Sequence, residues 1–213
     1  MKFDIRIVFL LFIIYAFIGW VIEVIDAYIK TDKFVNRGFL IGPYCPVYGV
    51  GCTLMIILLS KYLDDIVVLF FMCIVTFSIL EYMTSFVMEK LFKARWWDYS
   101  NKRFNINGRI CLETMIPFGL GGVFVMYVVN PVIMYVLTSM PDILLTIFSI
   151  VIGILYTLDL CVSVKVISNL KMTARNIKKD STIEITRKVK EILSNKNYIK
   201  RRLIKAFPKL KIK

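Results

Sequence analysis

Long apolar stretches alternate with short polar segments along this chain, and the alternation occurs five times. The apolar stretches cover residues 7–25, 47–63, 66–87, 115–136 and 143–167. A helix needs about 20 apolar residues to cross the hydrocarbon core of a bilayer, and each stretch comes near that length. The pattern therefore predicts an all-α, polytopic bundle of about five transmembrane helices.

The composition supports a membrane protein. Hydrophobic residues make up 58% of the 213 positions and the mean hydropathy is +0.71, whereas soluble domains are ~45–50% apolar. The first apolar run is long, lacks a small-x-small cleavage site and ends in Trp20, Glu23 and Asp26. We therefore interpret it as a retained helix and not as a signal peptide.

Lysine and arginine are concentrated in alternate connections between the apolar stretches. Three lie in the first connection, one (Lys61) at the end of the second stretch, six in the third connection and none in the fourth. Membrane proteins carry more Lys and Arg in their cytoplasmic loops than in their external ones. We therefore expect the N-terminus outside the cell, and the two long connections and the C-terminal segment in the cytoplasm.

The C-terminal segment holds nearly all of the excess positive charge. Residues 168–213 contain fifteen Lys and Arg against three acidic residues, while the whole chain has a formal charge of +13. Asp180 and Glu184 match a helix capping box, and apolar positions in 185–207 recur every three to four residues. We expect residues 1–167 to form the bundle and 168–213 a cytoplasmic tail, whose basic amphipathic helix lies on anionic inner-leaflet lipid. An acidic partner protein is the alternative, and nucleic acid is not expected.

Several kinds of chemistry are excluded or disfavoured. The chain has no histidine, so it lacks imidazole general bases and Ser-His or Cys-His nucleophile pairs. Its five cysteines form no CxxC pair, and we expect them to pack as small apolar residues without a metal or cofactor. No GxxxxGK[ST] loop is present, so ATP hydrolysis would need a separate subunit. We do not expect the chain to be an enzyme by itself.

Carboxylates inside or at the ends of apolar stretches are the main candidates for function, because an ionisable group is costly in a membrane. Glu81, Ser85 and Glu89 recur every four residues and so share one helix face. The six carboxylates are Glu23, Asp26, Glu81, Glu89, Glu113 and Asp159. Two interpretations stay open: a polar cavity for a cation, a proton or a head group, or ion pairs that hold the loops to the bundle.

The first and third connections resemble each other. Residues 34–38 contain Asn36 and Arg37 before a glycine, and residues 104–109 contain Asn107 and Arg109 around one. Each connection follows an acid-bearing helix and leads into the next helix, as in the parallel repeats of some transporters. Chance similarity is the alternative explanation.

The third connection also carries an aromatic segment, residues 95–100, that includes Trp97 and Asp98. Tryptophan and tyrosine favour the headgroup level of a bilayer, so we expect an interfacial anchor. A cation-binding cage, with its rings turned inward, is the alternative.

Several motifs together resemble the bacterial membrane-protein family of type-IV ABC-transporter permeases. They are KFVNRGFLIGPYCPVYGVG (33–51), EYMTS (81–85), EKLF (89–92), WWDYS (96–100) and NINGRICL (105–112). The resemblance covers residues 10–165. It implies a multi-pass protein of the bacterial cytoplasmic membrane that works with a separate ATP-binding subunit. Since five spans are few for a permease, it also implies a homo-oligomer.

The leading hypothesis is thus a transporter subunit with a carboxylate and arginine site on its cytoplasmic side. The candidate site residues are Glu23, Asp26, Asn36, Arg37, Glu81, Ser85, Glu89, Trp97, Asp98, Asn107, Arg109 and Asp159. A membrane-embedded enzyme or binding protein for a lipid or polyprenyl head group is the alternative. A third hypothesis is an assembly protein whose tail recruits a partner.

Overall fold

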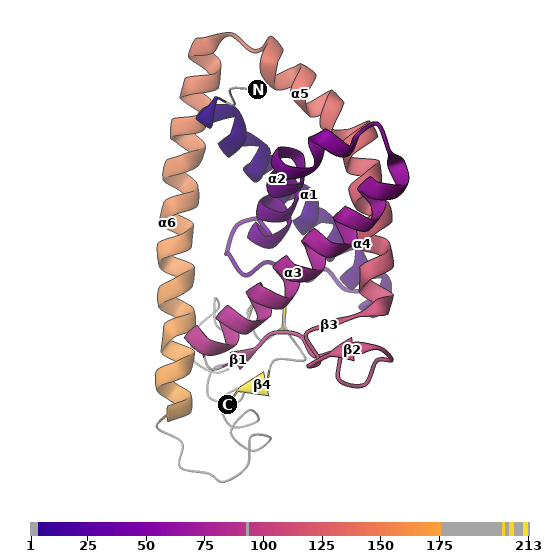
Figure 1. The fold of residues 1–213 in the computed structure, drawn as a ribbon. Helices are drawn as coiled ribbons and strands as arrows, with labels where there is room; N and C mark the ends of the chain where they lie inside the picture. The colour runs from indigo at the N-terminus through magenta and orange to yellow at the C-terminus, as the bar shows by residue number, and fades with distance from the viewer. Residues whose placement is uncertain (1–3, 93, 176–201, 203–204, 207–210, 213) are drawn as a thin grey trace.

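The computed structural model describes residues 4–92, 94–175, 202, 205–206 and 211–212. Most of this part is helical (Figure 1). The α-helices are α1 (Ile5–Thr31), α2 (Pro46–Leu59), α3 (Ile66–Phe92), α4 (Leu112–Phe124), α5 (Asn130–Ser139) and α6 (Asp142–Arg175). A 3-10 turn, η1 (Ser60–Tyr62), extends α2, and a π-helical segment, η2 (Val125–Val129), joins α4 to α5.

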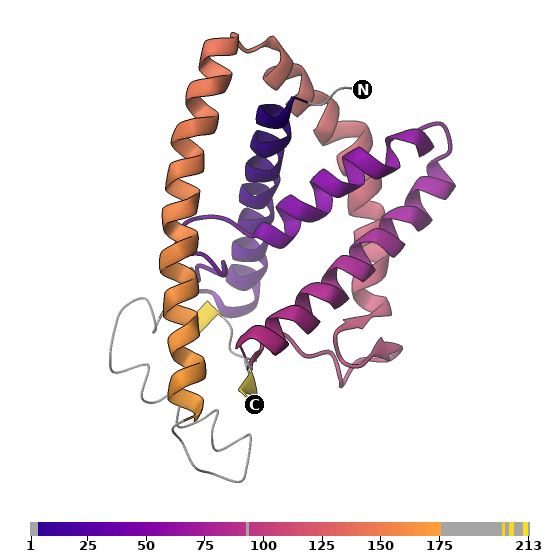
Figure 2. The same cartoon turned by 60° about the vertical axis from the view of Figure 1, so that its left-hand side comes forward.

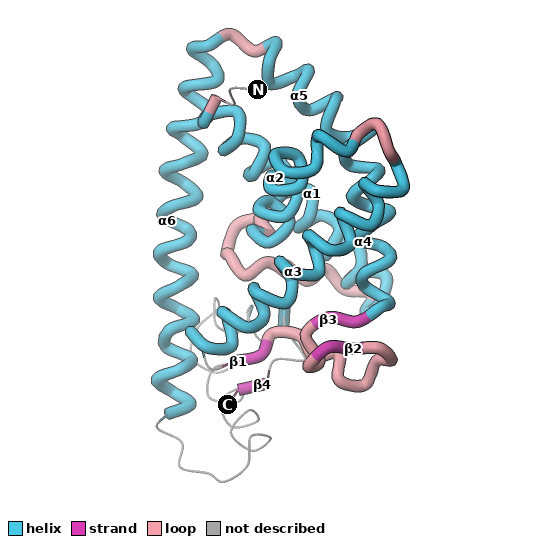
Figure 3. Tube along the Cα trace, in the orientation of Figure 1, coloured by secondary structure: helices cyan, strands magenta, loops and turns pink. Residues whose placement is uncertain are grey.

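Four very short strands complete the described part. β1 (Ala94–Arg95) pairs antiparallel with β4 (Lys211–Ile212), and β2 (Asn105–Ile106) pairs antiparallel with β3 (Ile110–Cys111). All four lie at the end of the molecule opposite the turn between α5 and α6 (Figure 3). The connection between α3 and α4 and part of the C-terminal segment therefore share one end of the bundle.

The prediction of a membrane helix bundle is confirmed. Four helical segments are long and apolar enough to span a bilayer, and a shorter apolar helix accounts for the second predicted span. The four are Ile5–Thr31, Ile66–Phe92, Leu112–Ser139 and Asp142–Val166, and the shorter one is Pro46–Tyr62. The short helix begins at Pro46, because proline suits the first position of a helix and its ring blocks an earlier start.

The span from α4 to α5 is continuous but not regular. Its π-helical turn ends just before Pro131, which has no amide hydrogen to donate to the carbonyl of Tyr127 one turn earlier. A widened turn is a common response of a helix to such a missing bond. The segment still crosses as one unit.

The core lies between α1, α2, α3 and the middle of the α4–α5 span. Its most deeply buried side chains are Leu11, Tyr15, Met55, Leu69 and Cys73. The outer faces of the same helices are also apolar, which suits helices surrounded by lipid. Helix α6 stands to one side of the bundle (Figure 2), and only 6% of its membrane-spanning window is buried.

The predicted basic helix at 180–207 lies almost wholly outside the described residues. Within its range, the guanidinium of Arg202 donates to the carbonyl of Phe39 at 3.4 Å. Farther on, Ile212 pairs with Ala94 in the β1–β4 ladder. Described parts of the basic segment therefore contact the same end of the bundle as the two long connections.

Candidate functional site

The connection between α1 and α2, residues 32–45, is called loop 1, and Asn36 organises it. The indole nitrogen of Trp20 on α1 donates to Asn36 Oδ1 at 2.8 Å, and the amide of Gly38 donates to the same oxygen at 3.2 Å. Asn36 Nδ2 in turn donates to the carbonyl of Ile41 at 2.9 Å. One side chain thus ties loop 1 to α1 and closes the loop on itself.

Asp159 on α6 holds the other side of loop 1. Its carboxylate accepts the backbone amides of Ile41 at 3.0 Å and Gly42 at 2.7 Å, and it also accepts the hydroxyl of Ser163 at 2.9 Å. A Cβ atom at position 42 would lie 2.8 Å from Asp159 Oδ2, so glycine is needed for this approach. The predicted site residue Asp159 is therefore bound to loop backbone.

This contact lies within the part of α6, Asp142–Val166, that is long and apolar enough to span a bilayer. Asp159 is 17 residues into α6, about 25 Å along the helix axis, whereas the hydrocarbon core is ~30 Å thick. Irregular backbone is tolerated at such a depth only where protein satisfies its polar groups. The Asp159 carboxylate meets that need for two of the amides of loop 1.

Glu23, Arg37 and Tyr48 form one half of a polar group inside the bundle. The Tyr48 hydroxyl on α2 donates to Glu23 Oε1 at 2.9 Å, and Arg37 Nε lies 3.6 Å from Glu23 Oε2. Gly19 leaves room for this contact, because a Cβ atom at position 19 would overlap the Tyr48 ring. Arg37 Nε is buried and has no hydrogen-bond partner. The ion pair therefore leaves the guanidinium incompletely satisfied.

Glu81 and Tyr99 form the other half. The Tyr99 hydroxyl donates to Glu81 Oε1 at 3.2 Å, while Glu81 Oε2 is buried without a hydrogen-bond partner. Burial, then the carboxylates of Glu81 and Glu23, raise the pKa of Tyr99 well above its usual value. Both carboxylates therefore act on the same phenol. We call Glu23, Arg37, Tyr48, Glu81 and Tyr99 the intramembrane cluster.

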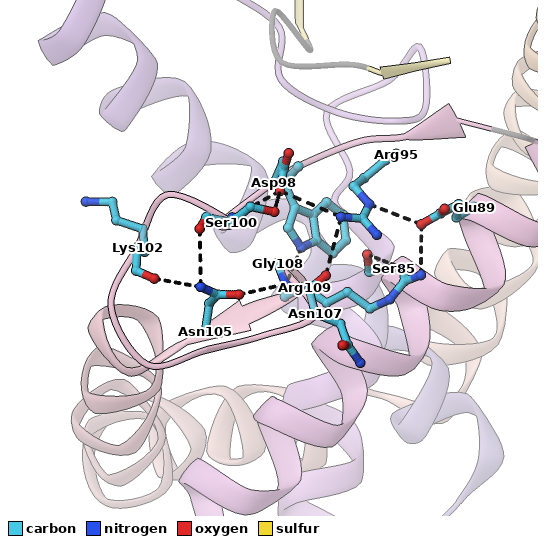
Figure 4. A network of polar contacts seen from close by, with 11 residues as sticks. Ser85, Glu89, Arg95, Asp98, Ser100, Lys102, Asn105, Asn107, Gly108 and Arg109 are labelled. Atoms are coloured by element: carbon cyan, nitrogen blue, oxygen red, sulfur yellow. Dashed lines mark hydrogen bonds and ion pairs between the residues drawn. The ribbon is translucent and has the colours of Figure 1, made fainter. Parts of the chain in front are cut away.

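The connection between α3 and α4 is called loop 2, and its described residues are 94–111. Arg109, which is only 8% exposed, donates to Ser85 Oγ at 3.0 Å and to Glu89 Oε2 at 2.8 Å. Arg95 donates to the same Glu89 oxygen at 3.1 Å (Figure 4). The stripe of Ser85 and Glu89 on α3 therefore serves to hold loop 2.

The other predicted residues of loop 2 brace its turn. Trp97 Nε1 donates to the Arg109 carbonyl at 3.0 Å, Asp98 accepts the amide of Ser100 at 3.0 Å, and Asn107 Nδ2 donates to the Tyr82 hydroxyl at 2.9 Å. Asn107 and Gly108 both have positive φ, as a type I′ hairpin turn requires. These residues therefore build a rigid hairpin.

Loop 1 and loop 2 touch through aromatic rings. The Phe39 ring in loop 1 lies 5.7 Å from that of Trp96 and 6.0 Å from that of Phe92. Trp96 is only 3% exposed, so this tryptophan packs inward. The anchor that the sequence predicts for this segment therefore does not rest on Trp96.

Two of the predicted acids lie apart from these groups. Asp26 pairs with Lys30 on the exposed side of α1, and Glu113 pairs with Lys102, which raises the pKa of that lysine. Within the described residues, no three His, Cys, Asp or Glu side chains converge as a metal site. An apolar hollow of about 270 Å³ lies between α3 and α4 instead, lined by Ile66, Val67, Phe70, Leu120 and Val123.

Tyr48 and Tyr99 are absent from the residues that sequence reasoning proposed. Both stand inside motifs that were noted for their resemblance to a family, Tyr48 in residues 33–51 and Tyr99 in 96–100. A tyrosine in a conspicuous motif was therefore the available signal. Each supplies the hydroxyl that meets an intramembrane carboxylate.

Comparison with known proteins identifies a family and nothing narrower. A family model described as "Putative ABC-transporter type IV" matches residues 10–164, which include most of α1, all of α2 to α5 and most of α6. No curated protein and no solved structure matches the chain.

Proposed function

Since the chain belongs to the family described as "Putative ABC-transporter type IV", we propose that it is a transporter subunit whose solute or ion passes the intramembrane cluster. The observation that carries this proposal is the buried Glu81 carboxylate with one oxygen unpartnered, near Glu23 and Tyr99. Buried polar atoms without partners are rare in proteins, because they cost stability. Their presence inside a membrane is therefore typical of a functional site.

Contacts elsewhere support this choice among the candidates. Arg109 donates to both Ser85 and Glu89, and Asp159 accepts two amides of loop 1. The side chains of Arg109 and Asp159 are therefore already hydrogen-bonded to protein groups and are not waiting for a solute. Arg37 and Glu81 each keep a buried polar atom without a hydrogen-bond partner, and Glu23 pairs with Arg37, so we propose these three residues as the solute or ion contacts.

The proposed orientation places the basic connections and the tail in the cytoplasm, as the distribution of Lys and Arg predicts. In that orientation, an ATP-binding partner would meet the end of the bundle that carries β1 to β4. Purification of the full chain in mild detergent, followed by mass spectrometry, tests this. A stoichiometric ATP-binding protein is expected, and its repeated absence would contradict an ABC-type assembly.

Substitution of Glu81 tests the proposed site. Glu81→Gln keeps an oxygen for the Tyr99 hydroxyl and removes only the charge, so we expect a stability change within about 1 kcal/mol and loss of transport. Because the solute is unidentified, the measurement is a comparison of small-molecule and lipid profiles. Cells that lack the protein would be complemented with the wild type or the variant.

Glu89→Gln is the matched control, one carboxylate two turns farther along α3. It weakens the pairing with Arg95 and Arg109, so it should lower stability, and its activity should follow the amount of folded protein. A Glu81→Gln protein that restores the wild-type profile completely would contradict the proposed role of Glu81.

A further inference from the structure

The hairpin of loop 2 exposes two large apolar side chains at the end of the bundle. Phe104 is 79% exposed and Ile106 is 52% exposed. Ile106 lies in β2, and Phe104 stands in the turn directly before that strand, so the two exposed side chains are close together in the chain. Arg109 holds the hairpin to α3, and Trp97 donates to the Arg109 carbonyl. These bonds fix the position of the hairpin relative to α3.

The backbone at Phe104 indicates that this side chain is not present for the sake of the turn. Its φ is +51°, in the left-handed region that favours glycine and asparagine. Two other positions of the hairpin with positive φ, 107 and 108, hold Asn and Gly. A phenylalanine at position 104 is conformationally unfavourable, and it is therefore expected to make a contact that glycine or asparagine would not supply.

Helix α4 shows what that contact is. Along α4, apolar residues at every fourth position are exposed, and they form a stripe that faces lipid in a membrane-spanning helix: Leu112, Ile116, Leu120 and Phe124. In the β2–β3 ladder Asn105 pairs with Cys111, so Phe104, directly before Asn105, and Leu112, directly after Cys111, both adjoin this pair. The exposed apolar residues of the hairpin thus lie beside the first residue of the stripe.

We propose that the exposed surface of the hairpin formed by Phe104 and Ile106 binds lipid and inserts at the boundary between headgroups and acyl chains. The hairpin lies between the last residue of α3, Phe92, and the first residue of α4, Leu112, so it stands where these two spans would leave the membrane. Arg103, directly before Phe104, is exposed and suits a phosphate headgroup. An aromatic ring beside a cation is typical of interfacial segments.

Spin labels on the full chain in phosphatidylethanolamine and phosphatidylglycerol vesicles test the proposal. The background is Cys161→Ala, because the other four cysteines are buried. Labels replace Phe104 or Ile106, with a lipid-facing reference at Ile116 and an exposed polar control at Asn101. Collisions with oxygen, which concentrates in acyl chains, are compared with collisions with a water-soluble nickel chelate.

The ratio of oxygen to nickel collisions should be severalfold higher at 104 and 106 than at 101, and close to that at 116. Ratios like that at 101 would overturn the proposal and leave this surface to a water-soluble protein partner. Phe104→Trp provides a second measurement if a label disturbs the loop. Its added fluorescence should be quenched by lipids with brominated acyl chains, and no added quenching would also overturn the proposal.

Discussion

Loop 1 and loop 2 each place an arginine beside a glutamate of the preceding helix, but the two arginines are held differently. Arg109 of loop 2 lies 2.8 Å from Glu89, donates to Ser85, and its guanidinium stacks over the ring of Phe86 at 5.5 Å. Arg37 of loop 1 lies 3.6 Å from Glu23, and its Nε has no hydrogen-bond partner.

The two loops also differ in what fixes them. Loop 2 is held by its own arginines on α3, whereas loop 1 is held by Asp159 of α6 through backbone amides. Since another helix fixes loop 1, Arg37 is not needed for that task. The comparison suggests that similar short sequences serve fold stability in loop 2 and a solute site in loop 1.

The largest effect expected is from Arg109→Met. It removes from a buried group one of the two arginines that pair with Glu89, so we expect a loss of about 3 kcal/mol in the free energy of unfolding. Arg37→Met should cost much less, because its ion pair is long and its Nε unpartnered. Unfolding in mixed detergent micelles measures both, and equal losses would contradict the distinction between the loops.

An intermediate effect is expected from Asp159→Asn. The NH₂ group of the asparagine would face one of the two backbone N–H groups that now donate to Asp159, and two donors cannot bond each other. We therefore expect a loss of about 2 kcal/mol in the free energy of unfolding. Ser163→Ala is the control for Gly42, because the Ser163 hydroxyl bonds Asp159 and the Ile41 amide but not the Gly42 amide, and its loss should cost about 1 kcal/mol or less. Amide hydrogen exchange at Ile41 and Gly42 should become faster in Asp159→Asn. Unchanged exchange there would show that Asp159 does not hold loop 1.

The helices were predictable from the sequence because apolar length alone determines a membrane span. Predicted spans and observed helices agree at 66–87 inside Ile66–Phe92, and the loops at 32–45 and 94–111 match the polar connections. The second helix is shorter than a usual span, since Pro46 sets its start and a 3-10 turn its end. Local rules were sufficient for these features.

The arrangement of the site was much less predictable. Spacing of four residues places Glu81 and Glu89 on one face of α3, but it does not say which element lies opposite each. Glu89 meets two arginines, whereas Glu81 meets a phenol from loop 2 and keeps an oxygen free. The partners of Asp159 are backbone amides, which have no residue signature. Such differences depend on tertiary packing.

The smallest effects expected come from two tryptophans that make equivalent bonds to the two loops. Trp20→Phe removes the donor to Asn36, and Trp97→Phe removes the donor to the Arg109 carbonyl, so each should cost about 1 kcal/mol or less. Asn36 keeps the Gly38 amide at the same oxygen, so Trp20→Phe should cost the less of the two.

Their effects on activity should run the other way. Asn36 adjoins Arg37 in the chain, so a shift of Asn36 displaces a proposed solute contact, whereas Trp97 donates to the Arg109 carbonyl and lies two residues from Tyr99, which is not a proposed contact. In cells that lack the protein, Trp20→Phe should therefore restore the small-molecule and lipid profile less well than Trp97→Phe does. The free energy of unfolding should fall more for Trp97→Phe. If activity followed stability in both variants, the Asn36–Arg37 segment would be as purely structural as the hairpin of loop 2, and the solute site would have to be sought elsewhere.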